Sequence, residues 1–186
     1  MRESQKQRIQ RCIDFLRPLQ SEFAESLSEV YWLGARNADP DQGPSYCRDC
    51  CDTHVDRLNA EHPDHEYLRD GGWGYEADTP EICDDCGAFL NCTLTHCGVA
   101  SELEHWANAR IALRGRYQAS TAFELLLILE SGSLEDYWLS APHMQPYEVR
   151  RIKLIHRGVH ALTRRIDLIA HRAAQRAQAQ KEQGND

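Results

Sequence analysis

The sequence lacks the motifs of the common enzyme classes and any long apolar run. GxSxG, HExxH, P-loop and GxGxxG patterns are all absent. The longest apolar run, Phe123 to Leu129, is interrupted by Glu124 and is far too short to cross a bilayer. The charged N-terminus is not followed by the apolar segment of a signal peptide. These absences predict a soluble, intracellular, cytoplasmic protein with no membrane contact.

Cysteine, in contrast, is abundant, with eight residues in a chain of 186. Thiols stay reduced inside cells, so this setting favours metal binding over a disulfide-stapled secreted domain. Four cysteines form two CxxC pairs, and Gly87 directly follows the second pair. Two thiolates from each turn would complete a tetrahedral zinc site. The predicted ligands are Cys47, Cys50, Cys83 and Cys86.

These two pairs resemble those of zinc-ribbon and zinc-knuckle proteins over about residues 46–90. The resemblance implies a structural zinc held by four thiolates, and it names no particular family. The spacer between Cys50 and Cys83 is 32 residues, longer than in a compact ribbon. A short helix and a hairpin would have to fit inside it.

Other cysteine and histidine residues leave alternatives open. Cys51 or His54 could replace Cys50 in the zinc shell. A second metal site could use Cys51, His54, Cys92 and Cys97, although buried free thiols are the preferred interpretation. A metal-dependent enzyme using His54, His62 and His65 is the least favoured hypothesis, and catalysis stays undecided with a preference against it.

Apolar periodicity predicts a mainly α protein: a helical bundle with a small α+β zinc-binding insertion and a long C-terminal helix. Its segments are a helix over 3–33 broken or kinked at Pro18, a short helix after the first CxxC pair, and a hairpin turning at Gly71–Gly72. Further segments are a strand at 93–95, a helix capped by Ser101, a buried helix over 120–130, a packed turn at 134–139 and a helix over 147–182. We predict three divisions: 1–38 and 101–186 form the bundle, and 39–100 is the acidic, zinc-binding insertion.

Charge is distributed unevenly along the chain. The net charge is −8, yet residues 39–85 carry 14 acidic side chains against three arginines, and the C-terminal segment is basic. The sequence therefore favours a non-enzymatic protein-interaction module, an adaptor, regulator or inhibitor with an acidic zinc-stapled surface. The alternative is a nucleic-acid-associated regulator or ribonucleoprotein component. Its candidate contacts on the C-terminal helix are Arg150, Arg151, Arg157, Arg164, Arg165, Arg172 and Arg176. In a variant of this hypothesis, the acidic face mimics nucleic acid and inhibits an enzyme that binds nucleic acid.

The last helix also carries apolar residues outside its main stripe. Leu154, Ala161 and Leu168 recur at heptad spacing. They predict that the C-terminal helix could form a homodimer.

Overall fold

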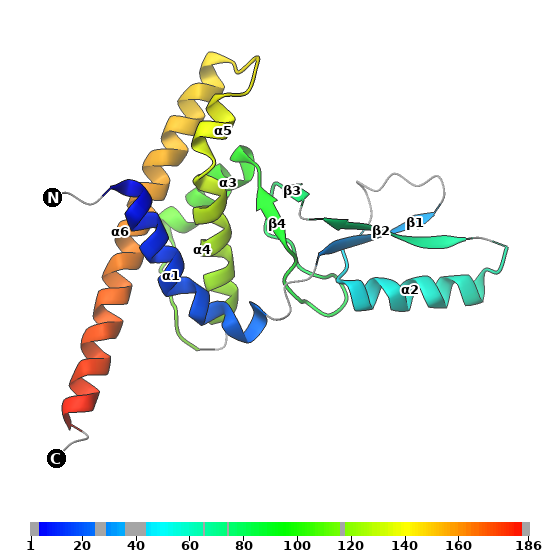
Figure 1. The fold of residues 1–186 in the computed structure, drawn as a ribbon, viewed down its shortest axis with the longest axis horizontal. Helices are drawn as coiled ribbons and strands as arrows, with labels where there is room; N and C mark the ends of the chain where they lie inside the picture. Colours follow the sequence, from blue (N-terminus) through cyan, green and yellow to red (C-terminus); the bar gives the residue numbers. More distant parts are fainter. Residues whose placement is uncertain are drawn as a thin grey trace.

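The computed structural model describes residues 4–24, 29–35, 44–64, 66–73, 75–115 and 118–183. Figure 1 shows two parts, a bundle of helices and an arm that extends away from it. The bundle consists of α1 (Gln5–Ala24), α3 (His96–Asn108), α4 (Gln118–Gly132), α5 (Glu135–Leu139) and α6 (Pro146–Gln183). The arm consists of β1 (Val30–Ala35), α2 (Arg48–Glu61), β2 (Tyr67–Trp73) and the turn that holds Cys83 and Cys86. The predicted fold class is confirmed.

Helix α4 forms the centre of the bundle because it is apolar on nearly every side. Ten of its fifteen residues are buried, including Leu125, Ile128 and Leu129. The stripe of α6 predicted from the sequence packs into the same core, with Ile152 and Ile166 fully buried. Gly132 of α4 permits close approach, since a Cβ there would lie 2.6 Å from Val159 Cγ2 on α6. Burial of these aliphatic side chains is the main force holding the bundle together.

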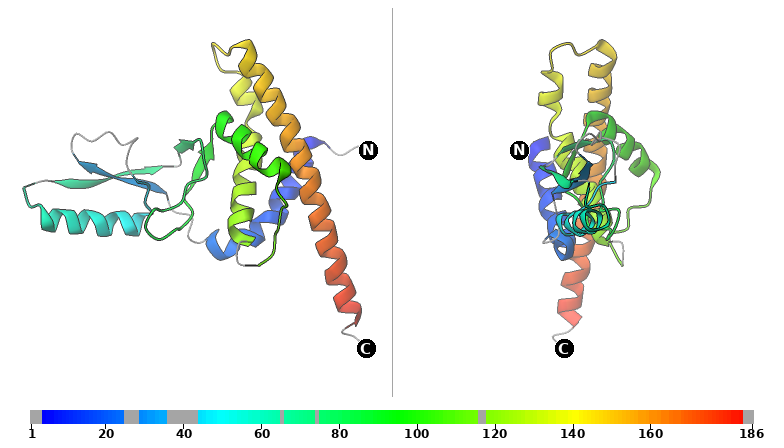
Figure 2. Two further views of the ribbon diagram at one scale, coloured as in Figure 1. Left: turned by 180° about the vertical axis from the view of Figure 1, so that it is seen from behind. Right: turned by 90° about the vertical axis from the view of Figure 1, so that its right-hand side faces the viewer.

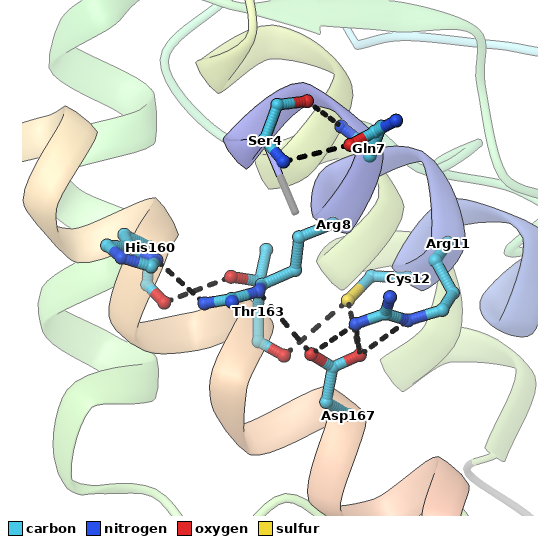
Figure 3. A network of polar contacts seen from close by, with 8 residues as sticks. All are labelled: Ser4, Gln7, Arg8, Arg11, Cys12, His160, Thr163 and Asp167. Carbon is cyan, nitrogen blue, oxygen red and sulfur yellow. Dashed lines mark hydrogen bonds and ion pairs between the residues drawn. The ribbon is translucent and has the colours of Figure 1, made fainter. Parts of the chain in front are cut away.

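Helices α1 and α6 are also joined by polar contacts (Figure 3). Arg11 forms a bidentate ion pair with Asp167, with its shortest contact at 2.9 Å. The Cys12 thiol donates a hydrogen bond to the Thr163 carbonyl at 3.5 Å. Arg8 lies 3.7 Å from Asp167 and 3.4 Å from His160 Nδ1. Together with the apolar contact between the two helices, this network fixes which face of α1 packs against α6.

The arm has a core of its own. β1 pairs antiparallel with β2, and α2 packs beside the two strands, as both figures of the whole chain show. Asn59 ties the end of α2 to β2, because its side chain accepts from the Tyr67 amide at 2.8 Å and donates to the Tyr67 carbonyl at 3.0 Å. The buried residues of the arm are Tyr31, Tyr46, Cys47, Cys51, Cys83 and Leu90.

A short parallel pair connects the arm to the bundle. β3 (Tyr75–Ala77) pairs with β4 (Cys92–Leu94), and the segment between these strands contains the second CxxC turn. β4 is anchored on α4, since the Leu94 amide donates to Ser131 Oγ at 2.9 Å in a buried position. The second CxxC turn is therefore held at the root of the arm, against the bundle.

Three local predictions are wrong, and long-range pairing or capping explains each. The predicted helix over 3–33 ends at Ala24 and runs unbroken through Pro18, whereas residues 30–35 form a strand because β2 offers them a backbone partner. The hairpin expected at Gly71–Gly72 is absent, since β2 is one strand paired with β1 and β3 pairs with β4. Ser101 lies inside α3, whose N-cap is Thr95. The predicted three-way division of the chain stays a prediction.

The remaining segments agree with the sequence. The helix after the first CxxC pair is α2, the strand near 93–95 is β4, and the buried helix is α4. The packed turn is α5, and the long C-terminal helix is α6. None of the helices within the described ranges is long and apolar enough to cross a membrane.

Candidate metal centre

The first CxxC pair lies where the chain enters α2. Cys47 has an extended backbone and serves as the N-cap residue, and Cys50 lies in the first turn of the helix. The preceding residue, Tyr46, bonds to β1 through two backbone hydrogen bonds with Tyr31, of 3.0 and 2.9 Å. A strand on one side and a helix on the other therefore fix the position of the first pair.

The second pair lies in a tight turn that is closed by the isolated bridge between Ile82 and Phe89. The Cys83 amide donates to the Ala88 carbonyl at 2.7 Å, and the Gly87 amide donates to the Cys83 carbonyl at 2.9 Å. Gly87 has a φ of 72°, in the left-handed region that glycine adopts without strain. The glycine after the second CxxC pair is thus required by the turn itself.

Two hydrogen bonds hold the two turns against each other. The Ser45 amide donates to Asp84 Oδ2 at 2.7 Å, and the Asp84 amide donates to the Ser45 carbonyl at 2.9 Å. Ser45 precedes Cys47, and Asp84 lies between Cys83 and Cys86. These bonds bring the two pairs of thiols into one cluster.

The thiol cluster has the size of a tetrahedral metal site. The sulfur atoms of Cys47, Cys50, Cys83 and Cys86 all lie within 4.8 Å of one another. Cys47 Sγ and Cys86 Sγ are 3.7 Å apart. A zinc ion with four Zn–S bonds of about 2.3 Å requires sulfur atoms about 3.8 Å apart. The four residues therefore fit such an ion, and they could bind a metal.

Backbone amides point at the sulfur atoms of the cluster. Burial raises the pKa of Cys83, but backbone hydrogen bonds from Cys86, Cys47 and Asp85 lower it by more than burial raises it. The pKa is therefore lowered from 9.0 to about 7. Burial raises the pKa of Cys47 although the Cys50 amide donates to its sulfur. Burial also raises the pKa of Cys50. A cation at the centre would stabilise all four as thiolates, because metal binding displaces thiol protons.

The cysteines and histidine considered for a second metal do not come together. Cys51 is fully buried and donates to the Trp32 carbonyl at 3.6 Å. Cys92 belongs to the core of the bundle, and Cys97 lies 3.5 Å from an Arg151 nitrogen. Within the described ranges, the four-cysteine cluster is the one group of three or more potential ligands that could hold a metal ion. Burial raises the pKa of Cys51 and of Cys92 to about 11, as expected for packed free thiols.

Two of the histidines suggested for catalysis, His54 and His62, have different neighbours. His54 Nε2 is 3.2 Å from Asp85 Oδ2, and the ring of His54 lies 4.8 Å from that of Tyr46. His62 lies near Tyr67, with ring centroids 6.3 Å apart. His65 lies outside the described residues. The approach of His54 on α2 to Asp85 in the second CxxC turn was not predicted, because no sequence pattern pairs residues so distant.

The basic residues of α6 divide into two groups. Arg165 donates to the carbonyl oxygens of Trp106, Ala107 and Ala109, with the Ala107 bond at 3.0 Å, so its guanidinium caps the end of α3. Arg151 contacts Cys97. The remaining predicted contacts are exposed and form no hydrogen bond or ion pair with other described residues: Arg150, Arg157, Arg164, Arg172 and Arg176.

Comparison of this chain with protein-family models, with curated proteins and with solved structures finds no match. The class of protein is therefore defined by the fold and the site alone. The chain is a mainly helical protein with a projecting α+β arm and a four-cysteine candidate metal centre at the root of that arm.

Proposed function

We propose that this chain is a non-enzymatic, zinc-binding protein-interaction module in which the metal holds the arm and the arm presents an acidic surface to a basic protein partner. The observation that carries the proposal is the exposure of carboxylates over the whole arm. The exposed acidic residues of the arm are Asp49, Asp56, Glu61, Asp64, Glu66, Asp70, Asp84 and Asp85. An adaptor, regulator or inhibitor acting through such a surface would need no catalytic group.

Zinc is the metal that the ligand set favours. Four thiolates in tetrahedral arrangement select zinc or iron, and a mononuclear structural site of two CxxC turns is typical of zinc. Four thiolates would fill the coordination shell, so the ion would supply folding energy and no Lewis-acid chemistry toward a substrate. The bound ion and its four sulfurs would carry a net charge of about −2, which adds to the charge of the arm.

The arginines of the arm do not offset the exposed carboxylates toward a partner. Arg69 binds Asp52 at 2.6 Å and lies over the ring of Tyr31. Arg48 approaches Asp52 at 3.9 Å, and Arg57 lies 2.9 Å from His54 Nδ1. Arg48 and Arg69 share one carboxylate and Arg57 contacts a histidine, so the charge balance rests on numbers: the described arm has nine acidic side chains against three arginines, and its field toward solvent is negative. Such a field steers basic partners and repels nucleic acid backbones.

The test is capture of partners from native lysate by the zinc-loaded chain, at low and at physiological salt. We expect a basic protein to be captured by the wild type and lost from an Asp56→Asn/Glu61→Gln/Asp64→Asn variant. The matched control is Glu104→Gln, which removes an exposed carboxylate from α3 in the bundle. Equal capture by the wild type and by the triple variant, or no capture above background at either salt concentration, would contradict the proposal.

A second candidate function uses the other end of the molecule. The C-terminal end of α6 extends beyond the other helices (Figure 2). Arg172 and Arg176 belong to its fully exposed residues 171–183, and Arg164 is exposed on the part of α6 that packs in the bundle. They could contact the phosphates of DNA or RNA, which predicts affinity that falls steeply with salt and drops when the three become alanine. Salt-independent or absent binding of a duplex probe would exclude this candidate. A competition assay distinguishes this candidate from the hypothesis that the acidic arm mimics nucleic acid. A mimic would displace DNA from another protein but would bind no DNA itself.

A homodimer through α6 is also proposed rather than observed. Leu154 and Leu168 are 63% and 57% exposed, and Ala161 is exposed between them. Sedimentation of the wild type and of a Leu154→Gln/Leu168→Gln variant would test it. A monomeric wild type over the whole concentration range would exclude the dimer.

A further inference from the structure

A cavity of about 300 Å³ lies between the root of the arm and the bundle, and none of the four clustered cysteines lines it. One wall is aromatic, because Phe89 stacks on Phe123 with ring centroids 4.4 Å apart. Pro80 and Ile82 form the edge next to the second CxxC turn, and Ile82 is 49% exposed. The cavity is therefore open to solvent and has a preformed apolar surface.

Two carboxylates from different helices also line this cavity: Glu102 from α3 and Glu124 from α4. Neither forms a hydrogen bond or an ion pair with any other residue in the described part of the chain, and both are half-buried. Burial raises the pKa of Glu102, and burial followed by the charge of Glu102 raises the pKa of Glu124. Each carboxylate has thus lost solvent without gaining a partner, which is costly unless a cation compensates it.

His105 also lines the cavity. It is exposed, and its ring packs edge-on against Trp106 with centroids 5.3 Å apart. His105 lowers the pKa of both carboxylates when charged, yet no ion pair joins it to either. The negative potential of the cavity is therefore left for a ligand.

We propose that this cavity binds an alkyl ammonium or guanidinium group, carried either by a free amine or by a lysine or arginine side chain of a partner. The cationic head would lie between Glu102 and Glu124, where charge-assisted hydrogen bonds are strong. Its alkyl stem would lie along the Phe89–Phe123 wall, in the way that long basic side chains cover apolar surface.

This proposal is independent of the acidic arm, because none of the exposed carboxylates of the arm lines the cavity. It can hold if the arm has no basic partner, and it can fail while the arm binds one. The two sources of the cation differ in what surrounds the charged group. A free amine needs only the cavity, whereas a partner side chain arrives on a peptide backbone.

The test is a nuclear magnetic resonance titration of the full, zinc-loaded chain, following the ring signals of Phe89 and Phe123. The probes are n-butylamine hydrochloride and the peptide acetyl-Gly-Lys-Gly-amide, with acetyl-Gly-norleucine-Gly-amide as the uncharged control peptide. We expect saturable shifts with at least one cationic probe in the millimolar range and none with the norleucine peptide. Saturation with butylamine assigns the cavity to free amines as well, and saturation with the lysine peptide alone assigns it to a partner side chain.

The variants keep the shape of the cavity and change its charge. Glu124→Gln is expected to weaken binding about tenfold, and Glu102→Gln similarly. Glu104→Gln, on the exposed side of α3, is the matched control and should leave binding unchanged. The amide spectrum of each variant shows whether it is folded. Equal shifts with the norleucine peptide, no saturation with either cation, or unchanged affinity in both folded cavity variants would overturn the proposal.

Discussion

Cys47 Sγ and Cys86 Sγ lie 3.7 Å apart, although 39 residues separate them in the chain. This distance is the edge of a tetrahedral thiolate site, and two hydrogen bonds between Ser45 and Asp84, one to the Asp84 carboxylate and one from its backbone amide, help to set it. The start of α2 and the tight turn, which carry the four cysteines, thereby meet at one point, and β1 joins them through Tyr46. The candidate metal centre therefore lies where these parts of the arm meet.

Removal of the metal should unfold the arm and leave the bundle folded. Structural zinc supplies on the order of 10 kcal/mol to small zinc domains, and the buried core of the arm has only a few residues. We expect one zinc per chain in the wild type and a substoichiometric amount in Cys86→Ser. Hydrogen exchange should accelerate in α2 and β2 of that variant, while α4 stays protected by its own apolar core.

The control for this prediction is Cys97→Ser, which changes a thiol outside the cluster. It should retain one zinc per chain and normal protection of the arm. Full zinc occupancy in Cys86→Ser, or release of zinc from Cys97→Ser, would show that the ligand set is different.

Arg165 should contribute to stability rather than to any nucleic-acid surface. Its guanidinium satisfies three carbonyl groups at the end of α3, so Arg165→Ala is expected to cost about 1–3 kcal/mol of unfolding free energy. Arg165→Lys should recover only part of this, because an ammonium cannot reproduce the planar fork. Urea denaturation measures both. The neighbouring Arg164→Ala, at an exposed position, should change stability by less than about 0.5 kcal/mol, and an equal loss there would refute the assignment.

Gly98 should not tolerate a side chain. A Cβ at this position would lie 2.7 Å from the Asp78 carbonyl oxygen, which is backbone and cannot move aside. We expect Gly98→Ala to destabilise the protein by about 1–2 kcal/mol, after allowing for the better helix propensity of alanine. Gly158→Ala is the matched control, since its Cβ would meet only the tip of the Leu103 side chain at 2.8 Å. Thermal unfolding that ranks the two variants in the opposite order would be inconsistent with this contact.

Stability should fall at alkaline pH, partly through Cys12. Burial, followed by the charge of Asp167, raises the pKa of Cys12 from 9.0 to about 12. The unfolded chain loses this proton above pH 9.0, whereas the folded chain keeps it until about pH 12, so folding becomes less favourable across that window. Cys12→Ala should lose less stability than the wild type between about pH 8 and about pH 11 in urea unfolding. Parallel losses in the two proteins would rule out Cys12 as a contributor.

Short-range patterns predicted the parts of the fold that depend on short-range physics. The 3.6-residue period of Ile152, Ile155, Val159 and Ile166 predicted α6, and these residues are buried in the structure. The continuous apolar character of α4 likewise predicted its central position. The end of α1 was not predictable in this way, because β1 forms only where β2 supplies hydrogen bonds from 32 to 43 residues further along. Ser101 had the pattern of a helix cap, yet the structure uses Thr95, which bonds to the Gly98 amide.

By itself the sequence determined the candidate ligand set, because two CxxC turns offer four thiolates at the spacing that a single metal ion needs. It also determined the acidic character of the arm and the length of the last helix. Tertiary structure alone decided that Arg165 serves α3, that Cys51 and Cys92 lie in separate cores, and that Glu102 and Glu124 face one cavity. The physical reason is range: thiol spacing and helical periodicity act over a few residues, whereas capping, burial and the meeting of two carboxylates depend on which helices pack together.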